Sequence, residues 1–134
     1  MVCIYCSGAT RVTNSRLQKR QNQTWRRRQC LQCRAIFTTQ EIADLTTSLV
    51  VQYAKHAERP FSNHELFVSI YESCKHRPHA VADATALAQT VIAKLVQLQE
   101  EGAIARDHIA AVTYAVLERF DKAAATMYRA YHPA

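Results

Sequence analysis

The first 40 residues of this 134-residue chain contain no aspartate and no glutamate. They contain eight basic residues and carry a charge of +8, whereas residues 41–134 contain nine basic and eleven acidic residues and carry −2. This uneven distribution is typical of a small nucleic-acid-binding module joined to a near-neutral body. A basic surface that is merely solvated is the alternative, but solubility alone poorly explains a module of this length without any acid.

The chain also lacks a run of 18 or more residues free of polar and charged groups, so we expect no membrane-spanning helix. Its first ten residues, MVCIYCSGAT, lack the basic and apolar segments of a secretory signal. We therefore expect a cytoplasmic protein whose thiols stay reduced. An apolar content of 49% argues against a disordered chain. The length allows one ordinary domain, or a small module plus a compact domain.

Four of the five cysteines form two Cys-x-x-Cys pairs, Cys3 with Cys6 and Cys30 with Cys33, separated by 23 residues. In a reducing compartment, two such pairs are typical of a closed tetrahedral zinc site, which is structural because no coordination position is left for water or substrate. Two disulfides or an iron–sulfur cluster are the alternatives. The first 40 residues have little apolar surface, so we expect zinc binding to supply their folding energy.

Short strands are expected at 11–16, 25–29 and 35–40, with a polar connection at 17–23. With the two cysteine pairs they predict a zinc ribbon over residues 1–42. On a strand, Arg26 and Arg28 would face one side and Arg27 the other, so one side can contact DNA. Whether these side chains read bases or only clamp phosphates is open. The candidate DNA-binding residues are Arg11, Arg16, Lys19, Arg20, Arg26, Arg27 and Arg28.

Residues 48–134 are predicted to form a mostly helical domain that opens with a strand at 48–53, which makes the chain α+β. Ser62 and Glu65 form a capping box at the start of the first helix, and Phe61 and Leu66 form a hydrophobic staple. Cys74 lies on the apolar stripe of this helix and is interpreted as a buried core thiol. The helices are expected from 62 to about 77, where Pro78 follows, at 80–101 before Gly102, at 106–119, and from 121 to about 131.

Several motifs point to one family. They are the four cysteines, Ser15-Arg16, Arg26-Arg27-Arg28 before Cys30, Phe37-Thr38-Thr39-x-Glu41, Arg59-Pro60-Phe61, Leu66, Arg77-Pro78 and Asp121-Lys122-x-Ala124. With these motifs, the chain resembles the NrdR-type transcriptional repressors of ribonucleotide reductase genes. Members of that family have an N-terminal zinc ribbon followed by an ATP-cone domain.

The resemblance implies a zinc-dependent DNA-binding repressor that binds double-stranded DNA, forms a homo-oligomer and senses ATP or dATP with magnesium. The candidate nucleotide-binding residues are Val51, Tyr53, Lys55 and Arg59. The family usually has lysine at two positions that are Tyr53 and Glu65 here. We therefore predict a nucleotide affinity well below that of a cone with both lysines. The alternative is a degenerate cone that binds no nucleotide and serves only in protein–protein interaction.

An enzymatic role is the third interpretation of the sequence. The segment His56-Ala57-Glu58 matches the H-x-E part of the zinc-deaminase signature. That signature also needs a following P-C-x-x-C, and none follows residue 58. We therefore expect no enzymatic activity.

Overall fold

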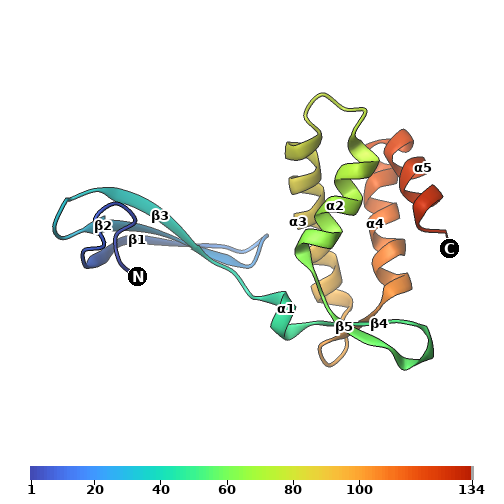
Figure 1. Ribbon diagram of the computed structural model, residues 1–134, viewed down its shortest axis with the longest axis horizontal. Coiled ribbons are helices and arrows are strands. Elements are labelled where there is room, and N and C mark those ends of the chain that lie inside the picture. The colour runs from blue at the N-terminus through green and yellow to red at the C-terminus, as the bar shows by residue number, and fades with distance from the viewer. Residues whose placement is uncertain (134) are drawn as a thin grey trace. The chain divides into compact units, whose positions relative to one another are not determined.

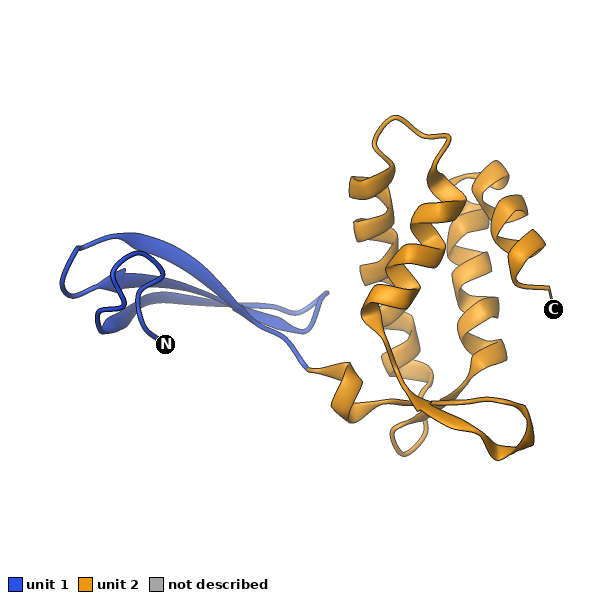
Figure 2. Ribbon diagram, viewed as in Figure 1, with its two compact units in different colours: residues 1–43 blue, residues 44–134 orange. Residues whose placement is uncertain are grey.

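The computed structural model describes residues 1–133 and separates the chain into two compact units, 1–43 (unit 1) and 44–134 (unit 2) (Figures 1 and 2). Unit 1 contains β1 (Thr10–Gln18), β2 (Gln23–Cys30) and β3 (Ile36–Glu41). Unit 2 contains α1 (Leu45–Ser48), β4 (Val50–Gln52), the 3-10 turn η1 (Ala54–His56), β5 (Glu58–Pro60), α2 (Asn63–Cys74), α3 (Ala80–Leu98), β6 (Ala103–Ala105), α4 (Arg106–Phe120) and α5 (Lys122–Tyr131). The expected α+β class, with a small β module followed by a mostly helical region, is confirmed.

Unit 1 is an antiparallel sheet in the order β1-β2-β3. The first two strands are longer than the sequence predicted, because the ladder between β1 and β2 continues until Gln18 pairs with Gln23, whereas β3 has the predicted length. The polar connection expected over 17–23 is therefore shorter: a turn at 19–22, with 17, 18 and 23 belonging to the strands. Most side chains in this part of the hairpin are polar. No alternation of apolar and polar residues therefore marks the ends of the two strands in the sequence.

One β-bulge decides which side chains of β1 share a face. The pairing of β1 with β2 shifts by one residue between Val12 and Asn14. Arg11 and Arg16 are five positions apart and would point to opposite faces of a regular strand. The bulge adds one residue to β1 between them and so shifts the alternation by one position. Both side chains therefore lie on the same face.

Unit 2 opens with a small sheet in the order β5-β4-β6, in which β4 runs antiparallel to β5 and parallel to β6. The strand expected over 48–53 is only β4, and Asp44 instead caps the short helix α1 by accepting a hydrogen bond from the Thr46 N–H at 3.0 Å. Lys55 and His56 form the tip of the β4–β5 hairpin, with φ of 63° and 61°. Because β5 and β6 have three residues each, they are too short to produce a recognisable alternation.

The helix start at Ser62 is confirmed, because its hydroxyl oxygen accepts a hydrogen bond from the Glu65 N–H at 3.2 Å. The first two long helices end three residues earlier than predicted, at Cys74 and Leu98. The residues after Leu98 form a tight turn, with Gly102 at φ 78°, that leads into β6. The pairing of β6 with β4 therefore stops α3, which helical periodicity alone could not show.

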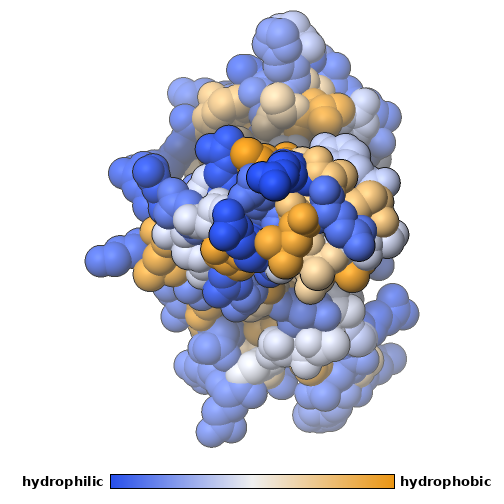
Figure 3. All heavy atoms as spheres, turned by 90° about the vertical axis from the view of Figure 1, so that its left-hand side faces the viewer, coloured by the Kyte–Doolittle hydropathy of each residue, from blue (hydrophilic) through white to orange (hydrophobic). Residues whose placement is uncertain are grey.

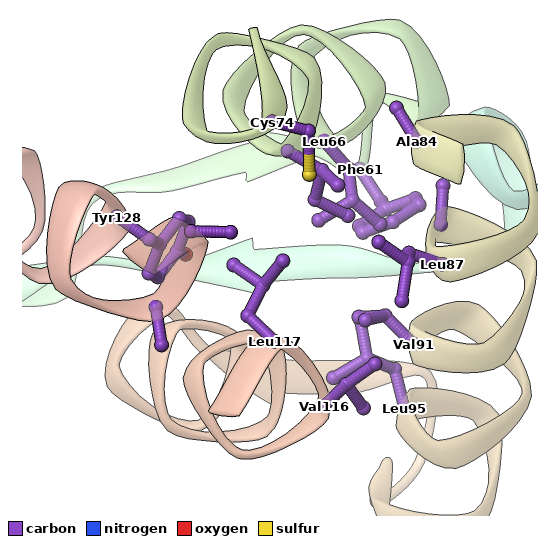
Figure 4. Packing of buried hydrophobic residues seen from close by; sticks show 14 of the residues in the cluster. Phe61, Leu66, Cys74, Ala84, Leu87, Val91, Leu95, Val116, Leu117 and Tyr128 are labelled. Carbon is purple, nitrogen blue, oxygen red and sulfur yellow. The ribbon is translucent and has the colours of Figure 1, made fainter. Parts of the chain in front are cut away.

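The four long helices enclose the core of unit 2, with α3 and α5 each contacting both α2 and α4. Figure 4 shows apolar side chains from all four helices directed inward. The side chains of Ile70, Val91, Leu95 and Leu117 have no exposed surface. Cys74 is equally buried, as predicted, and burial raises the pKa of its thiol.

A polar network joins α2, α3 and α5 at one end of this bundle. Arg77 donates from Nε to Asp83 and from Nη1 to Asp121, both at 2.8 Å, and His76 lies 3.0 Å from Asp121. Asp121 also caps α5. The N–H of Ala124, then Arg77 and His76, lower the pKa of the Asp121 carboxyl well below its usual range. The Asp121 carboxylate therefore stabilises the contact between these helices in its ionised form.

The helix α3 is long and apolar enough to cross a membrane by length and composition alone, with a mean hydropathy of 1.2. This is weak evidence for a membrane span, because the core helix of a soluble protein has the same length and composition. Here α3 contributes Ala84, Leu87, Val91 and Leu95 to the core of unit 2.

Candidate metal centre and nucleic-acid interface

The four paired cysteines come together at one end of the unit 1 sheet, where their sulfur atoms lie within 4.8 Å of one another. The Sγ atoms of Cys3 and Cys33 are 3.7 Å apart, and those of Cys6 and Cys30 are 3.4 Å apart. A tetrahedron with Zn–S bonds of about 2.3 Å has edges of about 3.8 Å. The donor set and its spacing therefore fit a structural Zn²⁺ with a closed shell of four thiolates.

The electrostatics of these thiols favours a bound cation. Burial raises the pKa of Cys30, but the backbone N–H groups of Cys33 and Gln32 outweigh it and lower the pKa to about 6. The N–H of Ala35 lowers the pKa of Cys33, but burial and the neighbouring thiols outweigh it and raise the pKa to about 12. A divalent metal ion among these sulfur atoms would stabilise their thiolate forms.

The pairing of the strands divides the basic residues of unit 1 between two faces. We call the side that carries Cys30, Arg26 and Arg28 the zinc face, and the other side the open face. Directly paired residues share a face, so the residues of the open face include Arg11, Asn14, Arg16, Trp25, Arg27, Gln29, Ile36, Thr38 and Gln40. The alternation predicted for residues 25–28 is therefore observed.

The arginines of the zinc face are engaged within the sheet. Arg26 forms an ion pair with Glu41. Arg28 donates to the hydroxyl oxygens of Thr39 at 3.3 Å and Thr10 at 3.4 Å. Both side chains are half-buried. They are consequently held in place by residues of the neighbouring strands β1 and β3.

The open face is different, because Arg11, Arg16 and Arg27 are exposed and none of the residues on this face within 1–41 is acidic. Arg11 donates to the side-chain oxygen of Gln29 at 2.9 Å, a neutral partner that leaves its charge uncompensated. The other two candidates, Lys19 and Arg20, lie in the exposed turn between β1 and β2. The sequence alone does not show that Arg11 and Arg16 share the face of Arg27, because that depends on the bulge in β1.

A cavity of about 150 Å³ in unit 2 contains part of the predicted nucleotide site. Val51, Tyr53 and Glu65 line it, whereas Lys55 lies at the hairpin tip and Arg59 stacks over the Tyr53 ring at 5.6 Å. Three further residues, Arg106, Tyr128 and His132, were not predicted from the sequence; α4 and the end of α5 bring them to the same cavity. No local motif marks them, because they meet the hairpin only through the packing of the helices.

The charges around this cavity suit a triphosphate poorly. Among the lining residues described, Arg106 is the one permanent cation, and Glu65 contributes a carboxylate. Burial, with a smaller contribution from Arg106, lowers the pKa of His132, which keeps its ring neutral near pH 7. The volume is also below the range of about 300–1,000 Å³ that is usual for small-molecule sites.

Comparisons with known proteins agree with this organisation. Residues 1–41 match the family model described as "Transcriptional repressor NrdR-like, N-terminal domain". The chain is similar to three proteins named "Transcriptional repressor NrdR". That of Syntrophotalea carbinolica is 38% identical over 76% of this chain and 63% of its own length. That of Bdellovibrio bacteriovorus is 30% identical over 98% and 69%, and that of Symbiobacterium thermophilum is 35% identical over 58% and 51%. The chain thus spans between about half and about two thirds of the length of these curated relatives.

Proposed function

The chain belongs to the family of NrdR transcriptional repressors, and on this premise we propose that it is a zinc-dependent, DNA-binding repressor of ribonucleotide reductase genes. It acts in the cytoplasm, where the thiolates stay reduced. Unit 1 binds double-stranded DNA, and unit 2 is an effector and self-association domain. No step of this function requires a catalytic group.

The observation that carries the proposal is the open face of unit 1. Arg11, Arg16 and Arg27 project from one side of a sheet held at its end by the cysteine cluster, and no carboxylate on that face competes for them. Phosphate groups of DNA are the partner that such a face fits best. Arg26 and Arg28 act mainly as positioning residues, because their side chains already bind Glu41, Thr39 and Thr10.

The test is a fluorescence-anisotropy titration of the full zinc-loaded chain with a labelled random-sequence duplex. Replacing Arg11 and Arg27 together by Ala should weaken binding strongly and flatten the plot of log K against log[salt] by about 0.9 per lost phosphate contact. The matched control replaces Arg106 and Arg119, two exposed arginines of unit 2, and should change neither quantity. Equal losses in both double variants would contradict the assignment of DNA binding to unit 1.

For unit 2, we propose weak binding of ATP and dATP with magnesium, and a larger role in self-association. Glu65 in the cavity would face the phosphates of a nucleotide, and Arg106 offers one compensating charge. A carboxylate about 4 Å from a phosphate costs on the order of 1 kcal/mol in water and more in a cleft. On α3, Val81 at 61% and Val96 at 40% are exposed apolar side chains that contact with a second copy would cover.

Calorimetric titration with Mg-ATP and Mg-dATP tests the nucleotide proposal. We expect weak or undetectable binding, which Glu65→Lys strengthens and the control Glu72→Lys on the outer surface of α2 does not. Low-micromolar binding that Glu65→Lys leaves unchanged would show that the nucleotide binds elsewhere. Sedimentation at several protein concentrations tests self-association, and a chain that stays monomeric would contradict it.

A further inference from the structure

The end of unit 1 that contains the four cysteines exposes a group of apolar side chains. Ile4 and Tyr5 of the first cysteine turn are 65% and 68% exposed, and Leu31 of the second is 59% exposed. Single exposed apolar residues are ordinary, but these come from two turns that share one four-sulfur cluster and so lie at the same end. We call these three residues the knuckle patch. Figure 3 looks onto this end and shows apolar atoms beside strongly hydrophilic ones.

The knuckle patch is held in a fixed shape by the sulfur atoms. The N–H of Tyr5 donates to the Cys3 sulfur at 3.4 Å, and the N–H of Gln32 donates to the Cys30 sulfur at 3.3 Å. The N–H of Leu31 donates to the carbonyl oxygen of Ala9 at 2.9 Å. The backbone of each turn therefore faces inward, and the side chains between the cysteines point outward. A partner would bind them without the entropy loss of ordering a flexible loop.

The charges near the knuckle patch identify the kind of partner. Arg34 follows the second cysteine turn and is exposed, and Arg11 begins the open face. No acidic residue occurs in positions 1–40. Ile36, 51% exposed, lies on the open face across the ladder from Gln29, so apolar surface continues from the cysteine end toward the arginines. Apolar side chains surrounded only by positively charged ones fit a partner that has negative charges outside and flat apolar surfaces within. DNA is such a partner, with phosphates outside and bases within.

We propose that the knuckle patch contacts the bases of bound DNA while the arginines of the open face hold the phosphates. This inference rests on the proposed function and adds a division of labour to it. Tyr5 has the chemistry to stack on an exposed base or wedge against a base step, and Ile4 and Leu31 supply the apolar contact beside it. The arginines determine affinity and its salt dependence, and the knuckle patch determines which sequences are preferred.

The test starts from a pool of randomised duplexes, from which the wild-type chain, Tyr5→Ala, Leu31→Ala and Tyr5→Phe are each used to select ligands. We expect the first two variants to select a less defined sequence and to bind the wild-type ligands about 5- to 100-fold more weakly. Their salt dependence stays that of the wild type, because no phosphate contact is lost. Tyr5→Phe keeps the ring and should keep most of the affinity.

The matched control is Tyr131→Ala, which removes an equally exposed tyrosine, 72% against 68%, from unit 2. It should select and bind the same duplexes as the wild type. Zinc content and Trp25 fluorescence verify that each unit 1 variant is folded. A variant that loses zinc is replaced by the next of the set, so that the comparison is always made between folded proteins.

The outcomes separate this inference from the function on which it rests. If Tyr5→Ala and Leu31→Ala bind the selected duplexes like the wild type while Arg27→Ala binds weakly, the knuckle patch does not contact DNA and only the inference is wrong. If the wild type enriches no sequence and binds no duplex, the proposed function itself fails. Binding of phosphatidylglycerol vesicles through Tyr5, with unchanged DNA binding, would assign the knuckle patch to a lipid surface and overturn the inference.

Discussion

Replacing Leu95 by Ala should unfold unit 2 far more easily while leaving unit 1 intact. Leu95 lies on α3 with no exposed surface, and its neighbours in the core include Val91 and Val116 (Figure 4). Truncation to Ala removes three side-chain carbon atoms that are surrounded on all sides. The packed helices cannot collapse completely onto the space, so both lost burial and a residual cavity destabilise the fold.

The expected cost is about 2–5 kcal/mol, the usual range for a buried Leu→Ala change. A unit the size of residues 44–134 has a total stability of roughly 5–14 kcal/mol, so the loss is a large part of it. It corresponds to a decrease in melting temperature of roughly 10–40 °C. Leu98→Ala is the matched control on the same helix, because Leu98 is 52% exposed and its loss leaves no enclosed cavity.

Two spectroscopic signals follow the two units separately. The described helices all lie in unit 2, so far-ultraviolet circular dichroism follows its unfolding. Trp25 is the only tryptophan and lies on β2, so its fluorescence follows unit 1. Leu95→Ala should shift the first transition strongly and the second hardly at all. Equal shifts for Leu95→Ala and Leu98→Ala would refute the assigned core, and a parallel shift in Trp25 fluorescence would refute the independence of the two units.

Three further outcomes are expected. Lys55→Asn combined with His56→Gly should stabilise unit 2 by about 1 kcal/mol in urea unfolding, because both residues have φ near +60° and Asn-Gly adopts it readily; no gain would show that the tip is unstrained. The lowered pKa of Asp121 means that its carboxylate stabilises unit 2 above its ordinary pKa of 3.8, and that this stability is lost as the pH falls through the folded-state pKa. Asp121→Asn should therefore make acid unfolding, followed by circular dichroism, less steep, and an unchanged profile would contradict the network. Metal analysis should give one zinc per chain, and a strong chelator should change Trp25 fluorescence but not the helical signal; a folded unit 1 without metal would contradict this.

The zinc site could be recognised without the structure because its signal is local. Each Cys-x-x-Cys turn brings two sulfur atoms together by itself, so two such turns are enough to predict a closed tetrahedral site. The cap at Ser62 and the buried Cys74 were predicted for the same reason, since helical geometry over a few residues decides both. The concentration of positive charge before residue 41 is a property of composition and needs no fold.

Pairing between distant segments decided which charged side chains lie together and where α3 ends. The bulge in β1 placed Arg11 and Arg16 on one face, and no feature of either residue reveals it. The parallel pairing of β6 with β4 ended α3 and brought Arg106 toward the hairpin, where it joins the cavity that contains Glu65. These contacts form because the apolar side chains and the backbone N–H and C=O groups of one segment find their partners in segments far away in the chain. Local spacing therefore predicted the ligands and the helices, and only the tertiary structure decided which charges act together.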